Sequence, residues 1–248
     1  MTINLLIAPD FAPERFAGWH MLNTLLQKRS GKHIHLVTPA SAHEQSELIQ
    51  QGNIELIYAN PFDAAAMIRE HGYHAVARPL GKADEMVISG KAEGDIRQLE
   101  DLKAGCTIAL ADNRDVKLIG LRLLEAVDLT ESDITWKVTE TYQAAARMLI
   151  KGEADAGFFL SEVYHSLSKL TLSQMKVLIE SELNDISHIV LVKDSFAESQ
   201  PFVDALLTLA DSEEGKSVLQ ELGMSHGFEA MNQEDGEFMV DLMDTLLD

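Results

Sequence analysis

Cysteine, positive charge and long apolar runs are all scarce in this chain of 248 residues. The single cysteine, Cys106, excludes an internal disulfide bond, and its apolar surroundings at 105–110 predict a buried, unreactive thiol rather than a nucleophile. Only 20 basic residues stand against 40 acidic ones, for a formal net charge of −20, so the positive surface that nucleic acid requires is missing. No run approaches the roughly 20 apolar residues of a membrane span.

Sequence signatures of catalysis and of metal binding are missing as well. The chain contains no Gly-x-Ser-x-Gly, no Gly-x-x-x-x-Gly-Lys-[Ser/Thr] and no Gly-x-Gly-x-x-Gly. Two histidine pairs, His33 with His35 and His71 with His74, have no cysteine or carboxylate at the usual zinc spacing. We therefore expect a protein that is not an enzyme and that needs no metal and no cofactor.

The first ten residues do not resemble a secretory signal. They carry no basic segment, and their apolar part is too short for a signal sequence. The expectation is a cytoplasmic protein, or a periplasmic one whose leader has been removed.

Short apolar runs alternate with amphipathic segments, at a spacing of roughly 20–25 residues that is typical of a parallel sheet covered by helices. Residues 48–58 and 148–158 repeat one local pattern of helix, glycine, acidic residue and strand, which favours two similar α/β lobes. Strands are expected at 5–8, 34–37, 55–58, 73–78, 107–110, 136–138, 154–159 and 177–179, and helices at 14–28, 41–51, 63–70, 116–126, 142–150, 201–211, 215–222 and 234–247.

Two further extended runs, 85–89 and 186–192, enter and leave the second series. We interpret them as two crossover strands that form a hinge. The predicted domains are a discontinuous lobe one, residues 1–88 plus 187–248, and a lobe two, residues 89–186. Ligands bind preferentially in the cleft that such lobes form.

The segment 55–63 carries the clearest indication of a binding site. Its apolar part reads as a buried strand, and Asn60-Pro61 ends that strand because proline cannot pair within a sheet. Asp63 then suits the positive end of a helix dipole. Tyr58 and Asn60 would lie at the carboxyl end of the strand, where open α/β sheets place their ligands, although an ordinary strand–helix corner has the same pattern.

Four segments resemble the substrate-binding proteins of phosphate, phosphite and phosphonate ABC transporters. They are 8–13 (Ala-Pro-Asp-Phe-Ala-Pro), 52–63 with its Tyr-Ala-Asn-Pro end, 99–105 (Leu-Glu-Asp-Leu-Lys-Ala-Gly) and 149–157. The resemblance implies an α/β, two-lobed type 2 periplasmic-binding-protein fold. It also implies capture of a small ligand without chemistry, and an ABC permease as a possible partner.

One segment departs from that family. Phosphonate binders usually carry serine and threonine after the first strand of lobe two, whereas residues 111–116 here read Ala-Asp-Asn-Arg-Asp-Val. Asp112 and Asp115 would repel a dianion, while Arg114 could bind an anion through two hydrogen bonds. The expected ligand is therefore a small anion or zwitterion, such as a phosphonate, a phosphate ester or a carboxylate.

Ten residues are the candidates for ligand binding. Trp19 and Phe11 could form an aromatic wall, and His188 could bind an anion, although a tryptophan at helical spacing, a lone histidine in a strand and Phe158 are also common in cores. The set is Asp10, Phe11, Trp19, Tyr58, Asn60, Asp84, Asn113, Arg114, Phe158 and His188.

Two other interpretations remain open. The first is a cytoplasmic ligand sensor on the same fold that gates a partner protein. The second is an enzyme like the pyrimidine-precursor synthases of thiamine biosynthesis, which would need a lysine or histidine placed for cofactor chemistry. The acidic C-terminal helix carries an apolar stripe of Phe238, Leu242 and Leu246, beside Met239 and Met243, which packs on lobe one or docks a partner.

Overall fold

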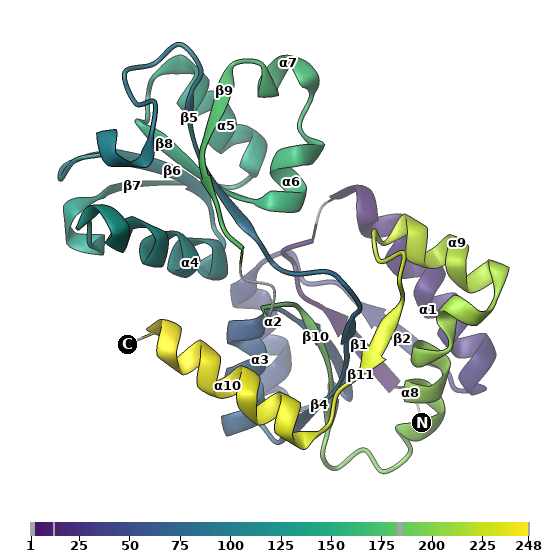
Figure 1. Cartoon of the computed structure of the whole chain (residues 1–248). Coiled ribbons are helices and arrows are strands. Elements are labelled where there is room, and N and C mark those ends of the chain that lie inside the picture. The colour runs from purple at the N-terminus through teal and green to yellow at the C-terminus, as the bar shows by residue number, and fades with distance from the viewer. Residues whose placement is uncertain (1–2, 12, 183–185, 248) are drawn as a thin grey trace. The chain divides into compact units, whose positions relative to one another are not determined.

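The computed structural model describes the chain except residues 1–2, 12, 183–185 and 248. The chain divides into two compact units (Figure 1). Unit 1 comprises Met1–Ala83 and Asp185–Thr245, and unit 2 comprises Asp84–Asn184 and Leu246–Asp248. Each unit is built on a sheet of its own and is described separately below.

The sheet of unit 1 has six strands in the order β11-β4-β10-β3-β1-β2. β1 pairs in parallel with β2 and β3, whereas β10 runs antiparallel to β3 and β4, and β11 runs antiparallel to β4. The four strands of the first alternating series, β1 to β4, therefore all run in the same direction, as the expected parallel sheet requires, and the antiparallel members are the run predicted as a crossover, β10, and the unpredicted β11. The bounds are β1 Ile3–Ile7, β2 Ile34–Val37, β3 Leu56–Ala59, β4 Tyr73–Pro79, β10 Ile189–Lys193 and β11 Phe228–Ala230.

The helices of unit 1 begin and end at residues that suit helix termini. Ser41 caps α2 by accepting a hydrogen bond from the Glu44 amide at 3.2 Å, and the Glu44 carboxylate accepts one from the Ala40 amide at 2.6 Å. Gly31 ends α1 in the left-handed conformation, at φ +67°. The helices are α1 Phe16–Ser30, α2 Ala42–Gln50, α3 Pro61–Glu70, α8 Gln200–Leu207, α9 Glu213–Glu221 and α10 Gln233–Leu247, with 3-10 turns at Pro13–Arg15 and Leu209–Asp211.

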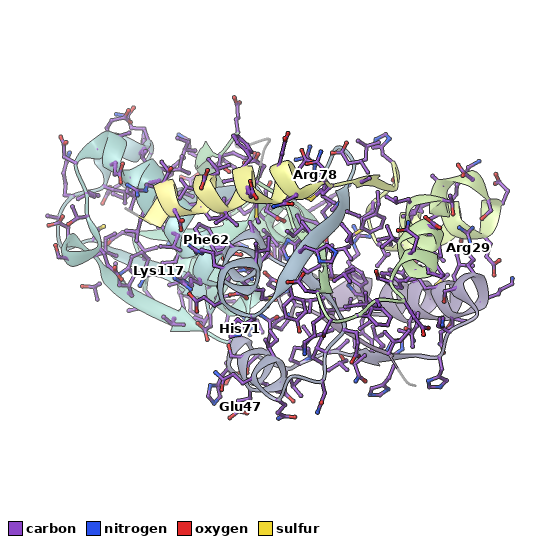
Figure 2. The ribbon with its side chains drawn as sticks, turned by 90° about the horizontal axis from the view of Figure 1, so that it is seen from below. Arg29, Glu47, Phe62, His71, Arg78 and Lys117 are labelled. Carbon is purple, nitrogen blue, oxygen red and sulfur yellow. The ribbon has the colours of Figure 1, made fainter. Side chains whose placement is uncertain are left out.

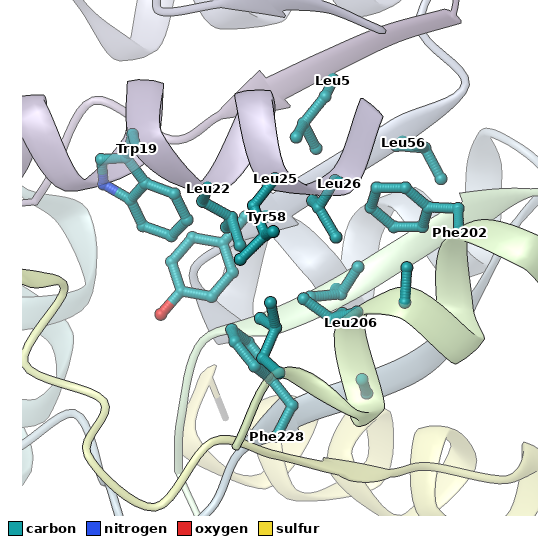
Figure 3. Close-up of a cluster of buried hydrophobic side chains, with 14 of the residues drawn as sticks. Leu5, Trp19, Leu22, Leu25, Leu26, Leu56, Tyr58, Phe202, Leu206 and Phe228 are labelled. Atoms are coloured by element: carbon teal, nitrogen blue, oxygen red, sulfur yellow. The ribbon is translucent and has the colours of Figure 1, made fainter. Parts of the chain in front are cut away.

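Alternate residues of each central strand point to opposite faces of this sheet. Leu5 and Tyr58 belong to a buried cluster with side chains of α1, α8 and α9 (Figure 3). The helices α2, α3 and α10 lie on the other face (Figure 1). On that face Phe62 is buried, while Glu47 on α2 points away from the protein (Figure 2). Both faces are covered, which is why the central strands read as continuous apolar runs.

The buried face of α10 differs from the predicted stripe. Met239, Val240 and Met243 are buried, whereas Phe238 is 61% exposed. A Cβ added at Gly236 would lie 3.4 Å from Ala75 Cβ, which shows how closely this helix packs on unit 1. The prediction is therefore wrong for Phe238 and confirmed for Met239 and Met243, while Leu242 and Leu246 are half-buried at the edge of the packed face.

Unit 2 has a five-stranded sheet in the order β7-β6-β8-β5-β9. The predicted crossover run at 85–89 is β5, which pairs antiparallel with β8 and β9. The strands are β5 Met86–Lys91, β6 Thr107–Ala111, β7 Thr135–Thr139, β8 Ala156–Leu160 and β9 Met175–Glu180. The helices are α4 Arg114–Leu124, α5 Tyr142–Lys151, α6 Ser161–Ser166 and α7 Lys169–Leu172, with 3-10 turns at Leu99–Asp101, Glu125–Val127 and Glu131–Asp133.

All eighteen elements named from the sequence, the two crossover runs included, have counterparts within a few residues of the expected bounds. The short elements α6, α7 and β11 were not predicted, because three to six residues are too few to show a periodic pattern. Within the described residues, no helix is long and apolar enough to cross a membrane.

Candidate functional site

Three chain segments meet at the carboxyl edge of the unit 1 sheet. Asp10 follows β1, Asn60 follows β3, and His188 immediately precedes β10. Because β10 is antiparallel to β3, its first residues lie beside the last residues of β3, with Ile189 paired to Ala59. The His188 Nε2 atom lies 3.1 Å from Asp10 Oδ1, and both side chains are nearly buried, at 10% and 13% exposure.

Asn60 joins this ion pair to the start of α3. Asn60 is the N-cap residue of α3: its Oδ1 accepts a hydrogen bond from the Asp63 amide at 2.8 Å. Its Nδ2 donates to Asp63 Oδ2 at 3.0 Å and to Asp10 Oδ2 at 3.3 Å. The cap holds the amide oxygen at the start of α3, and the carboxylates of Asp63 and Asp10 both accept hydrogen bonds from the Nδ2 group.

Aromatic rings form one wall of this group. The ring of Tyr58 stacks on His188, with centroids 5.0 Å apart and planes 22° apart, and the ring centroid of Trp19 lies 4.7 Å from that of Tyr58. Phe11 follows at 6.1 Å from Trp19. Figure 3 shows the indole nitrogen of Trp19 and the phenol oxygen of Tyr58 pointing out of the same side of the core cluster.

The indole N–H of Trp19 is buried and has no hydrogen-bond partner among the residues that the structure describes. A buried donor left unpaired costs free energy, which an acceptor on a ligand or a water would recover. Trp19 therefore combines core packing with a polar atom beside the candidate site. The two expectations for this residue, core and wall, are compatible.

The Asp10 carboxyl is held in its charged form. Burial alone would raise its pKa above the ordinary 3.8, but the charge and hydrogen bond of His188, a backbone hydrogen bond and the Asn60 amide together lower the pKa. The group therefore presents an ionised carboxylate whose hydrogen-bond partners are His188 and Asn60.

The four candidates of unit 2 have different environments. Asn113 caps α4 by accepting a hydrogen bond from the Val116 amide at 3.0 Å, and Arg114 is the exposed first residue of that helix. Asp84 is 8% exposed, at the start of the unit. Phe158 is fully buried, with its ring 5.7 Å from that of Trp136, so the packing interpretation describes it better than a ligand contact.

The ten predicted residues thus divide into a connected group and four separate positions. The structure brings together Asp10, Phe11, Trp19, Tyr58, Asn60 and His188 within unit 1. From the sequence, Asp63 has a predicted role only at the start of the helix, although the spacing of Asn60 and Asp63 also allows the hydrogen bond between their side chains. Gln45, which donates to Asp63, carries no sequence signal because it lies in a polar helix.

The remaining reactive residues do not add to this site. Burial raises the pKa of the Cys106 thiol, with a further contribution from Asp155, so its reactive thiolate is disfavoured. Across the described part of the chain, no group of three or more His, Cys, Asp or Glu side chains could hold a metal ion.

Comparisons with known proteins identify relatives of this architecture. A family model described as "ABC transporter, phosphonate, periplasmic substrate-binding protein" matches residues 5–235. PhnD1 from Prochlorococcus marinus in complex with methylphosphonate is similar at a TM-score of 0.83 and 11% identity, over 99% of this chain and 98% of that one. No curated protein sequence matches the chain.

Two further solved structures are similar. A binding protein component of an ABC phosphonate transporter from Pseudomonas aeruginosa has a TM-score of 0.78 at 13% identity, over 98% of this chain and 86% of that one. The periplasmic aliphatic sulphonate binding protein SsuA from Escherichia coli has a TM-score of 0.68 at 20% identity, over 98% of this chain and 87% of that one. At these identities the likeness concerns the fold, and it confirms the predicted two-lobed α/β architecture.

Proposed function

The chain belongs to the family of periplasmic substrate-binding proteins of phosphonate ABC transporters, and from this premise we propose which ligand it captures and where. The predicted resemblance is confirmed, and with it a role in binding a small molecule for a membrane permease rather than in catalysis. The match over residues 5–235 carries the proposal.

The proposed ligand is a small anion or zwitterion of the phosphonate, phosphate ester or sulfonate type. The donors that support it in unit 1 are His188 and the buried N–H of Trp19, beside the hydroxyl of Tyr58. Methylphosphonate, the ligand of the structurally similar Prochlorococcus protein, is the first compound to test.

The carboxylates around these donors favour a ligand of low charge. Asp10 belongs to the connected group and Asp63 is hydrogen-bonded to its Asn60, and each carboxylate would repel a dianion at close range. In unit 2, Asp112 and Asp115 flank the Arg114 position. A singly charged oxyanion, or a zwitterion whose ammonium group meets Asp10, is therefore the proposed class.

We place this capture in the periplasm, as the family description implies, with the permease as the protein partner. A cytoplasmic partner is the alternative. Cell fractionation of the native protein distinguishes the two, since periplasmic extraction releases a periplasmic protein and leaves a cytoplasmic one behind.

Thermal melting against a panel of ligands tests the proposal. The panel contains methylphosphonate, phosphate, phosphite, a phosphate monoester, methanesulfonate, a dicarboxylate and an amino acid. A ligand at 100 times its dissociation constant adds about 2.7 kcal/mol of stability. At about 2–4 °C per kcal/mol for a chain of this size, the melting temperature rises by roughly 5–10 °C.

Tyr58→Phe should reduce that rise, because it removes the hydroxyl beside Trp19 and His188 while keeping the ring. Tyr73→Phe is the matched control: its hydroxyl donates to the Ile54 carbonyl at 2.8 Å, on another part of unit 1. The control should lower the melting temperature and leave the ligand-induced rise unchanged. Absence of any rise across the panel would refute the anionic or zwitterionic ligand.

A further inference from the structure

Gln45 is the one fully buried polar residue of α2, a helix whose surface is otherwise largely polar and exposed. It is 2% exposed, and its Nε2 donates to Asp63 Oδ2 at 2.6 Å. Its Oε1 has no partner in the described parts of the chain. Gln45 and Asp63 both line a cavity of about 120 Å³ between α2 and α3, with Ile49, Met67 and His71.

A continuous chain of hydrogen bonds leads from Gln45 to the ion pair. Asp63 Oδ2 accepts from Gln45 and also from Asn60 Nδ2 at 3.0 Å. The same Asn60 amide donates to Asp10 Oδ2 at 3.3 Å, and Asp10 Oδ1 meets His188 Nε2 at 3.1 Å. Asp63 makes both of its links through Oδ2 and Asn60 makes both of its links through Nδ2, so a movement of the Asp63 carboxylate also changes the hydrogen bonding of the Asn60 amide.

We propose that Gln45 and Asp63 are positioning residues that set the orientation of Asn60, and through it the geometry of Asp10 and His188. Gln45 holds the Asp63 carboxylate against Asn60. Without this bond the carboxylate can turn into the adjacent cavity, and Asn60 loses the acceptor that directs its second N–H toward Asp10. The consequence for ligand affinity rests on the proposed function, whereas the effect on Asp10 does not.

The titration of Asp10 in the ligand-free protein tests this directly. The charged groups linked to Asp10 are His188, from the segment before β10, and Asp63, from α3 through Asn60. The Asn60 hydrogen bond is one of the causes that lower the Asp10 pKa, so loosening it moves the pKa up toward its ordinary value.

The variant is Gln45→Met, which keeps the length of the side chain and removes both polar atoms. Carbon NMR of the Asp10 carboxyl should show its midpoint rising by about 0.5 pH unit. Gln50→Met, an exposed position on the same helix that lines the same cavity, is the matched control and should leave the midpoint unchanged. An unchanged midpoint in Gln45→Met overturns the proposal, whatever happens to stability.

A charge-preserving exchange supplies the rescue. In the double variant Gln45→Glu with Asp63→Asn, the new amide can donate to the new carboxylate while its oxygen still accepts from Asn60. The midpoint of Asp10 should return to within about 0.2 pH unit of the wild-type value. Failure to return shows that the effect comes from altered packing at position 45, which also overturns the proposal.

Methylphosphonate binding by calorimetry separates this inference from the proposed function. If the wild type binds, Gln45→Met should bind roughly 3- to 10-fold more weakly, as expected for the net loss of one typical intramolecular hydrogen bond. Unchanged affinity together with a shifted midpoint overturns the link to ligand binding. If the wild type does not bind any member of the panel, the proposed function fails, and the midpoint alone decides the positioning role.

Discussion

Breaking the Asp10–His188 pair should destabilise unit 1 more than its exposed ion pairs do. The atoms are 3.1 Å apart and both side chains are nearly buried. At an effective dielectric constant of about 20, the gross attraction at this distance is about 5 kcal/mol, from which the cost of burial is subtracted. His188→Ala leaves a buried carboxylate without its partner, which typically costs about 3–5 kcal/mol.

Asp10→Ala should cost less, because an imidazole can release its proton near neutral pH, whereas a carboxylate stays charged. The two single variants and the double variant form a cycle in which the loss of the Tyr58 ring contact cancels. We expect a coupling energy of about 1.5–3 kcal/mol, the range for hydrogen bonds to charged groups.

Urea unfolding followed by tryptophan fluorescence measures this cycle. The chain has two tryptophans, and Trp136→Phe leaves Trp19 in the unit 1 core as the reporter. The pKa of Asp10 is lower in the folded protein than in the unfolded chain. The ionised carboxylate therefore contributes fully to the free energy of unfolding at any pH above its ordinary pKa of 3.8, and this contribution is lost as the pH falls through the pKa of the folded state. A coupling below about 0.5 kcal/mol at pH 6, or one that grows toward pH 3, would contradict a charged pair.

Three further outcomes are expected. Gly120→Ala should destabilise unit 2 by about 1–3 kcal/mol in urea unfolding, because the new Cβ would lie 2.2 Å from the Phe158 ring; a neutral result would contradict this packing. Met243→Ala should cost about 2–5 kcal/mol while Phe238→Ser stays within about 0.5 kcal/mol, and the reverse order would restore the stripe predicted from the sequence. Cys106 should react with a thiol reagent at pH 8 more slowly than free cysteine, because burial raises its pKa, and equal rates would show an accessible thiol.

The elements of the fold were predictable because each carries a local signal. Gly31 ends a helix, Ser41 with Glu44 begins one, and apolar runs mark the strands. The direction of β10 was not predictable from its apolar sequence, since pairing direction depends on where the chain re-enters the sheet. The helices α6 and α7 were not predictable either, because four to six residues cannot show a repeating pattern; α6 buries Val163 and Tyr164, whereas α7 buries none of its residues.

The candidate site shows a similar division. Tyr58 and Asn60 were placed correctly at the end of a strand, since proline and the helix start leave a clear signal. That His188 meets Asp10 could not be read from the sequence, because 178 residues separate them and only the antiparallel strand brings them together. The contact of Gln45 could not be predicted from the sequence either, because it depends on the Asp63 side chain of the neighbouring helix α3.

The buried pair also bears on how a chain with a net charge of −20 could hold an anion. The donors beside Asp10, such as His188, act on a ligand at short range, whereas the field of the whole protein repels anions at long range. Salt screens the second effect much more than the first, since the Debye length falls from about 30 Å at 0.01 M to about 8 Å at 0.15 M. Stopped-flow association of methylphosphonate should therefore become faster as sodium chloride is added, the opposite of electrostatically steered capture, with the dissociation rate little changed. An association rate that falls as salt is added would show that a local positive field attracts the anion. Carboxylates near the site would then not restrict the ligand to a low charge.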